Sequence, residues 1–185
     1  LLKTFVINLN FKSSCENCRD WGGGIAINDR GGAFNGSVYL SDEYNHVILK
    51  LDQSTGITTV YAGIPGVRGG SNGKSSESTF AVPRGLATDS QGNLYVADLG
   101  NSAIRKISSD GVTTTILSYT NCITGVAVDS FDQVFGVTEQ WCGPSIIKVG
   151  KGKVFDDSKS INSSINGAII GQIKFSVQSA FAIAS

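Results

Sequence analysis

The sequence contains no methionine, one histidine and three prolines, and it carries no net charge. Lysine plus arginine and aspartate plus glutamate each number 15, so the chain lacks the concentrated basic surface that binding to a nucleic-acid backbone requires. No uninterrupted apolar stretch approaches the roughly 20 residues of a membrane-spanning helix. We therefore expect neither a nucleic-acid partner nor a membrane span.

The motifs of common catalytic and phosphate-binding sites are also missing. The chain has no nucleophile elbow, no glycine loop followed by a helix, and no histidine-rich cluster. The one histidine, His46, is expected to be an exposed loop residue. From these absences we predict that the chain is not an enzyme, with no catalytic residue, no metal ligand and no cofactor.

What the sequence does contain is typical of an all-β protein. It has 23 glycines, with many serines, threonines and valines, and no sustained helical periodicity. Within Val82–Leu117, strand-forming segments alternate with turn formers. The expected strands are Gly85–Thr88, Leu94–Ala97, Ala103–Ile107 and Val112–Ile116. Four short antiparallel strands in so short a stretch predict one blade of a β-propeller.

This unit recurs along the chain. Gly36–Gly63 repeats its second, third and fourth strands, and Gly125–Ser130 repeats Gly85–Ser90. A period of about forty residues with loop insertions is typical of a radial array. We predict a single propeller segment over 1–185, with an outer strand of a preceding or shared blade at 1–12, blades at 24–63, 82–117 and 125–155, and the start of a further blade at 173–185.

At these residues the sequence resembles the NHL-repeat family. The phrases GNLYVADLGNSAIRKI (Gly92–Ile107) and VPRGLATD (Val82–Asp89) are similar to the family consensus, as is the linker Tyr61–Phe80 with its glycine-rich middle. The resemblance is close over Gly36–Leu117 and weaker over Gly125–Val149. It implies a β-propeller, in agreement with the strand assignment.

Asp42 with Asn45, and Asp98 with Asn101, form the most prominent repeated polar pattern. Carboxylate and amide oxygens are ligands for a cation such as Ca²⁺. The same residues also cap turns by binding backbone N–H groups. Because the pair recurs once per unit, we favour the structural role. Thr138 replaces the aspartate in the third unit.

The four cysteines, Cys15, Cys18, Cys122 and Cys142, allow three complete pairings. We favour Cys122–Cys142, because the segment before a blade's first strand and the loop after its second strand lie on the same face of a propeller. Cys15 and Cys18 would then pair across a tight loop. A zinc site at Cys15-x-x-Cys18 would need a second pair of ligands nearby, and free thiols are the third possibility.

Disulfides together with the Asn-x-Ser sequons at Asn35 and Asn162 favour a secreted, extracellular glycoprotein. The chain begins at Leu1, which we interpret as a processed chain or a part of a longer one.

We therefore hypothesise an extracellular, non-catalytic propeller that acts as a protein-interaction or structural module. Recognition would use the loop-bearing face, with Arg68, Asn72 and Lys74 of the linker Ile64–Ala81 and Trp141 as partner-binding residues. Incomplete blades at both ends would allow self-association into an oligomer or fibre, and glycans are a further candidate ligand. The alternatives are a metal-dependent propeller hydrolase or lyase with ligands on unseen chain, and a carbohydrate-binding module.

Overall fold

The structure is a computed structural model that describes residues 23–28, 36–138, 146–149 and 155–156. Several predictions concern residues outside these ranges and stay predictions. They are the segments 1–12 and 173–185, the sequons at Asn35 and Asn162, and the side chains Cys15, Cys18, Trp141 and Cys142.

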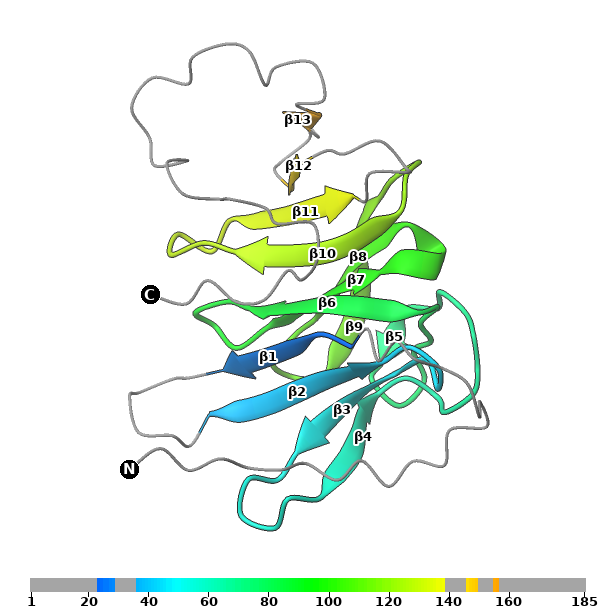
Figure 1. Cartoon of the computed structure of the whole chain (residues 1–185), viewed down its shortest axis with the longest axis vertical. Helices are drawn as coiled ribbons and strands as arrows, with labels where there is room; N and C mark the ends of the chain where they lie inside the picture. Colours follow the sequence, from blue (N-terminus) through cyan, green and yellow to red (C-terminus); the bar gives the residue numbers. More distant parts are fainter. Residues whose placement is uncertain (1–22, 29–35, 139–145, 150–154, 157–185) are drawn as a thin grey trace.

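Three antiparallel sheets stand side by side in chain order (Figure 1). The first contains β1 (Ile25–Asn28), β2 (Ser37–Asp42), β3 (Val47–Leu51) and β4 (Thr58–Ala62). The second has the order β5-β9-β8-β7-β6, with β5 (Gly73–Lys74), β6 (Pro83–Thr88), β7 (Leu94–Asp98), the 3-10 turn η1 (Leu99–Asn101), β8 (Ala103–Ile107) and β9 (Val112–Ser118). The third contains β10 (Ile123–Val128), β11 (Val134–Thr138), β12 (Ile146–Val149) and β13 (Phe155–Asp156). The predicted all-β, propeller-type architecture is confirmed.

The first strands of the three sheets, β1, β6 and β10, lie next to one another (Figure 1). A Cβ atom on Gly85 would lie 2.7 Å from the Cα atom of Gly125, and one on Gly24 would lie 2.4 Å from the carbonyl oxygen of Arg84. Ser41 Oγ joins the first two sheets by donating to that carbonyl at 2.6 Å. The missing side chains of the glycines therefore let the sheets approach at the centre of the molecule.

The core lies between the sheets, in two clusters that share strand β7. All five residues of β7 are buried. Leu94 and Val96 point toward the first sheet, and Tyr95 and Ala97 toward the third. A strand covered on both faces has apolar residues at successive positions rather than at alternate ones. The packing explains why LYVA is the most continuous apolar strand of its unit.

The linker 64–81, with its glycine-rich middle, pairs with the second sheet and packs into the core. Its strand β5 pairs with β9, and the N–H of Ser75 donates to the carbonyl of Gly111 at 2.8 Å. Phe80 and Ala81, near its end, are buried in the core. The linker is therefore part of the second sheet, whose outer edge it covers.

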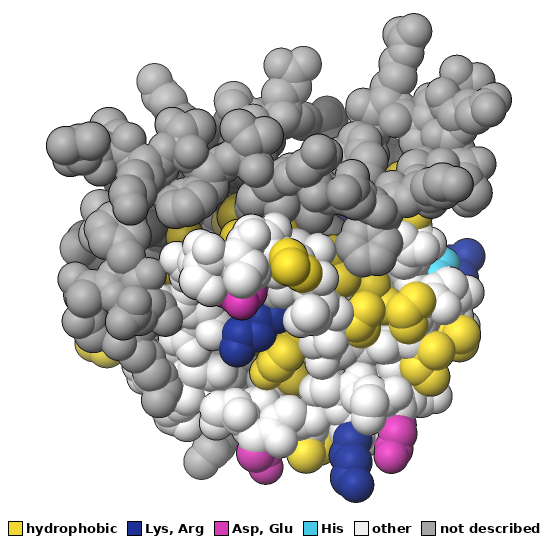
Figure 2. Space-filling model, turned by 90° about the horizontal axis from the view of Figure 1, so that it is seen from below, with side chains coloured by type: hydrophobic (Ala, Val, Ile, Leu, Met, Phe, Trp, Pro, Cys, Tyr) yellow, Lys and Arg dark blue, Asp and Glu magenta, His cyan; other side chains and the backbone are white. Residues whose placement is uncertain are grey.

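The described part of the face seen in Figure 2 shows few charged side chains, and several large apolar side chains of the described residues are exposed. In Figure 2 the apolar side chains gather on the side of the molecule that carries the histidine. Among the described residues, there is no helix whose length and hydropathy would let it cross a membrane.

Candidate functional site

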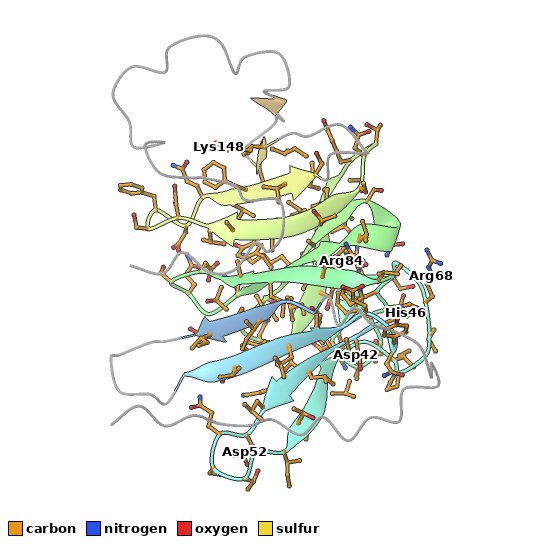
Figure 3. The ribbon with its side chains drawn as sticks, viewed as in Figure 1. Asp42, His46, Asp52, Arg68, Arg84 and Lys148 are labelled. Atoms are coloured by element: carbon orange, nitrogen blue, oxygen red, sulfur yellow. The ribbon has the colours of Figure 1, made fainter. Side chains whose placement is uncertain are left out.

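One end of the sheets carries the loop β2–β3 (43–46), the linker (64–81) and the turn η1 with Ser102 (99–102). We call these three segments the loop face. His46, Arg68 and Arg84 lie at this end of the molecule, and Asp52 lies at the opposite end (Figure 3). The loop face is the surface for which the sequence predicts partner binding.

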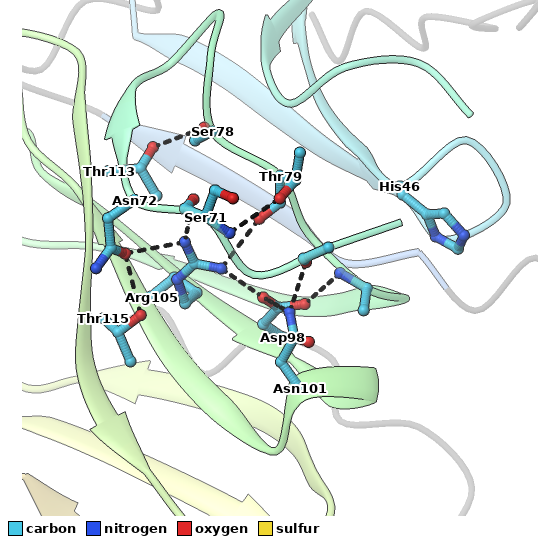
Figure 4. A network of polar contacts seen from close by, with 12 residues as sticks. His46, Ser71, Asn72, Ser78, Thr79, Asp98, Asn101, Arg105, Thr113 and Thr115 are labelled. Atoms are coloured by element: carbon cyan, nitrogen blue, oxygen red, sulfur yellow. Dashed lines mark hydrogen bonds and ion pairs between the residues drawn. The ribbon is translucent and has the colours of Figure 1, made fainter. Parts of the chain in front are cut away.

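The side chain of Arg105 on β8 forms hydrogen bonds with the linker (Figure 4). Its side chain is 1% exposed and forms an ion pair with the fully buried Asp98, with Nη1 and Oδ2 at 2.8 Å. Nη1 also donates to the carbonyl of Thr79 at 3.0 Å, and Nη2 donates to the carbonyl of Ser71 at 2.8 Å and to Oδ1 of Asn72 at 3.0 Å. One guanidinium thus fixes three linker residues by charge-assisted hydrogen bonds.

Asp98 completes this network. Its carboxylate accepts from the backbone N–H of Ala81 at 2.7 Å and from Nδ2 of Asn101 at 2.7 Å. Burial raises the pKa of Asp98 above its ordinary value, against the opposing effect of the N–H donors around it. Asn101 Nδ2 also donates to the carbonyl of Gly69. The Asp98–Asn101 pair therefore joins β7 to Gly69 and to Ala81 of the linker.

The equivalent pair in the first sheet closes its own turn. Asp42 accepts from the backbone N–H of Tyr44 and of Asn45, and from Nδ2 of Asn45 at 2.8 Å. The carboxylate oxygens of both aspartates thus accept hydrogen bonds within the protein, as the structural hypothesis predicts. Over the described ranges, no three His, Cys, Asp or Glu residues are grouped so that they could hold a metal ion.

Arg105 is the functional residue that the sequence analysis missed. Its place in the ladder of its sheet, opposite Val96, is occupied by Leu49 opposite Leu40 in the first sheet and by Ile147 opposite Gly136 in the third. A charged residue at a position that is apolar in both other repeats was the available signal. The guanidinium contacts the linker that precedes its own sheet and lies 5.2 Å above the ring of Phe80.

The exposed tip of the linker is a tight turn. The N–H of Val67 donates to the carbonyl of Ile64 at 2.9 Å, and Gly66 has φ = +76°, as a type II turn with the sequence Ile-Pro-Gly-Val requires. The N–H of Gly66 donates to the carbonyl of Asn45, which fastens this turn to the loop β2–β3. Ile64, Val67 and the neighbouring Tyr44 are 37%, 43% and 49% exposed. We call Tyr44, Ile64, Pro65, Val67 and Arg68 the turn patch.

The three linker residues that the sequence predicts to bind a partner lie in different environments. Arg68 is exposed, and its backbone bridges to Phe80. Asn72 is occupied by Arg105 and by the hydroxyl of Thr115, which donates to Oδ1 at 3.1 Å. Lys74 lies on β5 at the outer edge of the second sheet. Of these three, Arg68 alone belongs to the turn patch.

His46 also differs from the exposed residue that the sequence predicts. It is half-buried, and its Nδ1 accepts the backbone N–H of Val82 at 3.2 Å. Both residues have positive φ angles, 58° and 54°. For a β-branched residue such as Val82 this backbone conformation is strained. The histidine therefore stabilises the junction of the first two sheets.

Cys122, which directly precedes β10, is disulfide-bonded. The other three cysteines lie outside the described residues, so the pairing with Cys142 stays a prediction.

One family model and several known proteins are similar to this chain. The family model of the teneurin NHL domain matches residues 33–144. The Arabidopsis thaliana protein SUPPRESSOR OF QUENCHING 1, chloroplastic, is 44% identical over 75 residues, which are 40% of this chain and 7% of that protein. Human NHL repeat-containing protein 2 is 38% identical over 69 residues, 37% of this chain and 10% of the relative. The chain thus spans a small part of these relatives, and one of them is named for the chloroplast, so the family does not fix the compartment.

Three solved structures share the fold. The gluconolactonase of Xanthomonas campestris gives a TM-score of 0.54 at 15% identity, with 72% of this chain and 46% of that chain covered. Virginiamycin B lyase of Staphylococcus aureus gives 0.52 at 17% identity, with 72% and 39% covered. A chain of the nidogen/laminin complex gives 0.52 at 17% identity, with 71% and 46% covered. At these identities the likeness concerns the fold alone.

The prediction that the chain is not an enzyme is contradicted by these neighbours, because the lyase and the gluconolactonase are enzymes with the same fold. That prediction used the absence of local sequence motifs. A propeller instead gathers side chains from loops of several sheets, and no continuous motif records such a set. The fold is therefore one that carries both enzymes and binding proteins.

Proposed function

The chain belongs to the NHL-repeat family, and from this premise we propose that it is a protein-interaction module that binds its partner through the loop face. The observation that carries the proposal is the linker, which the buried ion pair Arg105–Asp98 anchors while its tip exposes apolar side chains. A loop that is already ordered loses little conformational entropy on binding. Exposed apolar side chains on such a loop are typical of a recognition surface.

Two further facts support this function. The linker contributes to the core through Phe80, so the binding loop and the scaffold form one unit. A propeller with the same fold was solved in the nidogen/laminin complex, which is an assembly of two proteins.

Within this proposal the protein acts outside the cell. The disulfide at Cys122 supports that location, because disulfides persist in oxidising compartments. The sequons at Asn35 and Asn162 would carry glycans there. Intact mass of the protein secreted from eukaryotic cells, before and after enzymatic deglycosylation, tests this. An unchanged mass would contradict the glycoprotein assignment.

Site-specific photo-crosslinking tests the function itself. A photoreactive amino acid would be placed at Val67 on the loop face, and at Phe131, 81% exposed in the loop β10–β11, as the matched control. Both chains would be incubated with an extract and medium of the source cells. We expect one defined protein adduct from position 67 and none from 131. Equal adducts from both positions, or none from 67, would refute recognition by the loop face.

Self-association is a second candidate function, and exposed apolar side chains of the first sheet support it. Ile25 and Ile27 of β1 are 43% and 57% exposed on either side of the buried Ala26. This strand thus presents apolar side chains on the side away from the second sheet. Light scattering of the native particle tests the idea, and a mass equal to that of the denatured chain would exclude it.

A further inference from the structure

We propose that the turn patch is a docking site for a partner segment that carries an acidic side chain next to an apolar one. The proposal rests on the protein-interaction function above and adds to it the position of the site and the chemistry of the ligand.

The patch is preorganised by its backbone. The type II turn is closed by the hydrogen bond from Val67 N–H to the carbonyl of Ile64, and the bond from Gly66 N–H to Asn45 fixes it against the loop β2–β3. Pro65 and Gly66 supply the φ angles that this turn needs, so the geometry exists before a ligand arrives. Ile64 and Val67, at the two ends of the turn, are therefore held side by side at the surface.

The apolar side chains of the patch are exposed in the described part of the chain. Tyr44, Ile64 and Val67 each expose more than a third of their surface. All three lie within two residues of the backbone hydrogen bond from Gly66 to Asn45 that joins the two loops, so they are grouped at one place on the surface. Tyrosine in particular combines a large apolar ring with a hydroxyl and is enriched at binding hot spots. An apolar or aromatic side chain of the partner fits this part.

The positive charge of Arg68 determines which charged group of the partner fits the patch. Arg68 is exposed and has no ion-pair partner among residues 23–28, 36–138 and 146–149. The neighbouring acidic groups are engaged: Asp42 accepts from Asn45, and Glu43 pairs with Arg84 at 3.1 Å. Arg68 is therefore the exposed charge beside the apolar cluster, and it is positive. A guanidinium matches a carboxylate through two parallel hydrogen bonds, which makes an acidic side chain the complementary group.

Selection of peptides from a random twelve-residue phage library against the full chain tests the proposal. We expect the bound peptides to carry Asp or Glu within a few positions of an apolar or aromatic residue. Arg68→Glu is expected to weaken such a peptide roughly 10- to 100-fold, since a charge-assisted hydrogen bond contributes about 1.5–3 kcal/mol. Val67→Ser should also weaken it. Lys74→Glu, with the same charge reversal on the same linker but on β5, is the control and should bind normally.

A charge swap makes the test specific. A peptide whose acidic residue is replaced by lysine should lose binding to the natural chain and regain it with Arg68→Glu. Thermal melting of each variant checks that the fold is intact. Peptides without acidic residues, equal loss with Lys74→Glu, or a library that yields no binder would each overturn the proposal.

The outcomes also separate this proposal from the function on which it rests. A photo-adduct at position 67 without peptide selectivity would leave a loop-face partner but refute the acidic ligand. If Arg68→Glu has a lower native particle mass than the natural chain, and no peptide binds, the occupant of the patch is a second copy of the chain. That result would refute a separate partner.

Discussion

Single residues decide how this propeller holds its loops, and Arg105 is the clearest example. It occupies a position that is apolar in the two other sheets, and it is 1% exposed. Burying a charge is costly unless it is paired and hydrogen-bonded. Here the cost is offset by Asp98 and by two linker carbonyls. The consequence is a long loop with a defined conformation.

Replacing Arg105 by leucine, the residue at the equivalent position of the first sheet, should lower the free energy of unfolding by about 3–5 kcal/mol, because it leaves Asp98 buried without its partner. Urea unfolding measures the change. Hydrogen exchange should show faster exchange at linker amides such as Thr79, whose carbonyl loses its donor.

The double variant Arg105→Leu/Asp98→Thr places an apolar residue and a threonine where the third sheet has Ile147 and Thr138, and it should regain part of the stability. Lys106→Gln, at the half-buried next position, is the matched control. A stability loss no larger for Arg105→Leu than for Lys106→Gln would show that the ion pair does not hold the linker.

Asp89 is a second residue whose side chain stabilises the fold through hydrogen bonds. It accepts from the side chain and backbone of Asn93 and from the hydroxyl of Tyr95 at 3.0 Å. Burial acts to raise the pKa of Asp89, but these hydrogen bonds outweigh it and lower the pKa below its ordinary value. In Tyr95, burial and the hydrogen bond to Asp89 raise the pKa, so the phenol stays neutral. The charged carboxylate is therefore the form that the fold favours.

A carboxyl with a lowered pKa in the folded state stabilises the protein above the unfolded pKa of about 3.9, and the contribution is lost as the pH falls through the folded value. Asp89→Asn should therefore be less stable than the natural chain at neutral pH, and the difference should shrink below about pH 4. Denaturant unfolding at several pH values measures this. Glu77→Gln, on an exposed linker side chain, controls for the loss of one charge. A difference that is constant with pH would contradict the assignment.

At the scale of the elements, the contact between sheets depends on the first strands. β1, β6 and β10 approach closely where Gly24 and Gly85 lack side chains. The strand pattern of the sequence predicts these strands well, because apolar residues and turn formers alternate in each repeat. The close approach of their backbones is a tertiary feature that a strand pattern does not encode.

Gly85→Val tests this contact. A side chain at this position would meet the backbone of Gly125, and overpacking of this kind costs about 1–3 kcal/mol. Gly56→Asn is the control, because Gly56 has φ = +73° with no atom within 4 Å, and asparagine tolerates this conformation. Chemical unfolding of both variants compares them. Equal stability of the two would mean that β6 and β10 can separate without cost.

On the scale of the whole molecule, two apolar clusters hold the sheets together. The first two sheets share a core around Phe80, and the second and third share one around Ile104 and Ile123. Cys122 is disulfide-bonded at the entrance to the third sheet. A disulfide adds stability by restricting the unfolded chain.

Reduction of the disulfides should lower the stability, and the loss of one bond typically costs about 2–5 kcal/mol. Thermal melting with and without a reductant measures the change. Mass spectrometry of a non-reduced digest should yield a linked peptide pair that contains Cys122 and Cys142. A pair that joins Cys122 to Cys15 or Cys18 would refute the predicted connectivity.

The sequence by itself determined the fold class, the strands of the central repeat and the structural role of the Asp–Asn pairs. These follow from local patterns, since period-two alternation, turn residues and repetition are all visible along the chain. Only the tertiary structure decided that the linker is ordered, that Asn72 and His46 are already engaged, and that the turn Ile64–Val67 lies against the loop β2–β3. These features depend on contacts between residues far apart in sequence, above all on the buried ion pair of Arg105, whose partners no local pattern can identify.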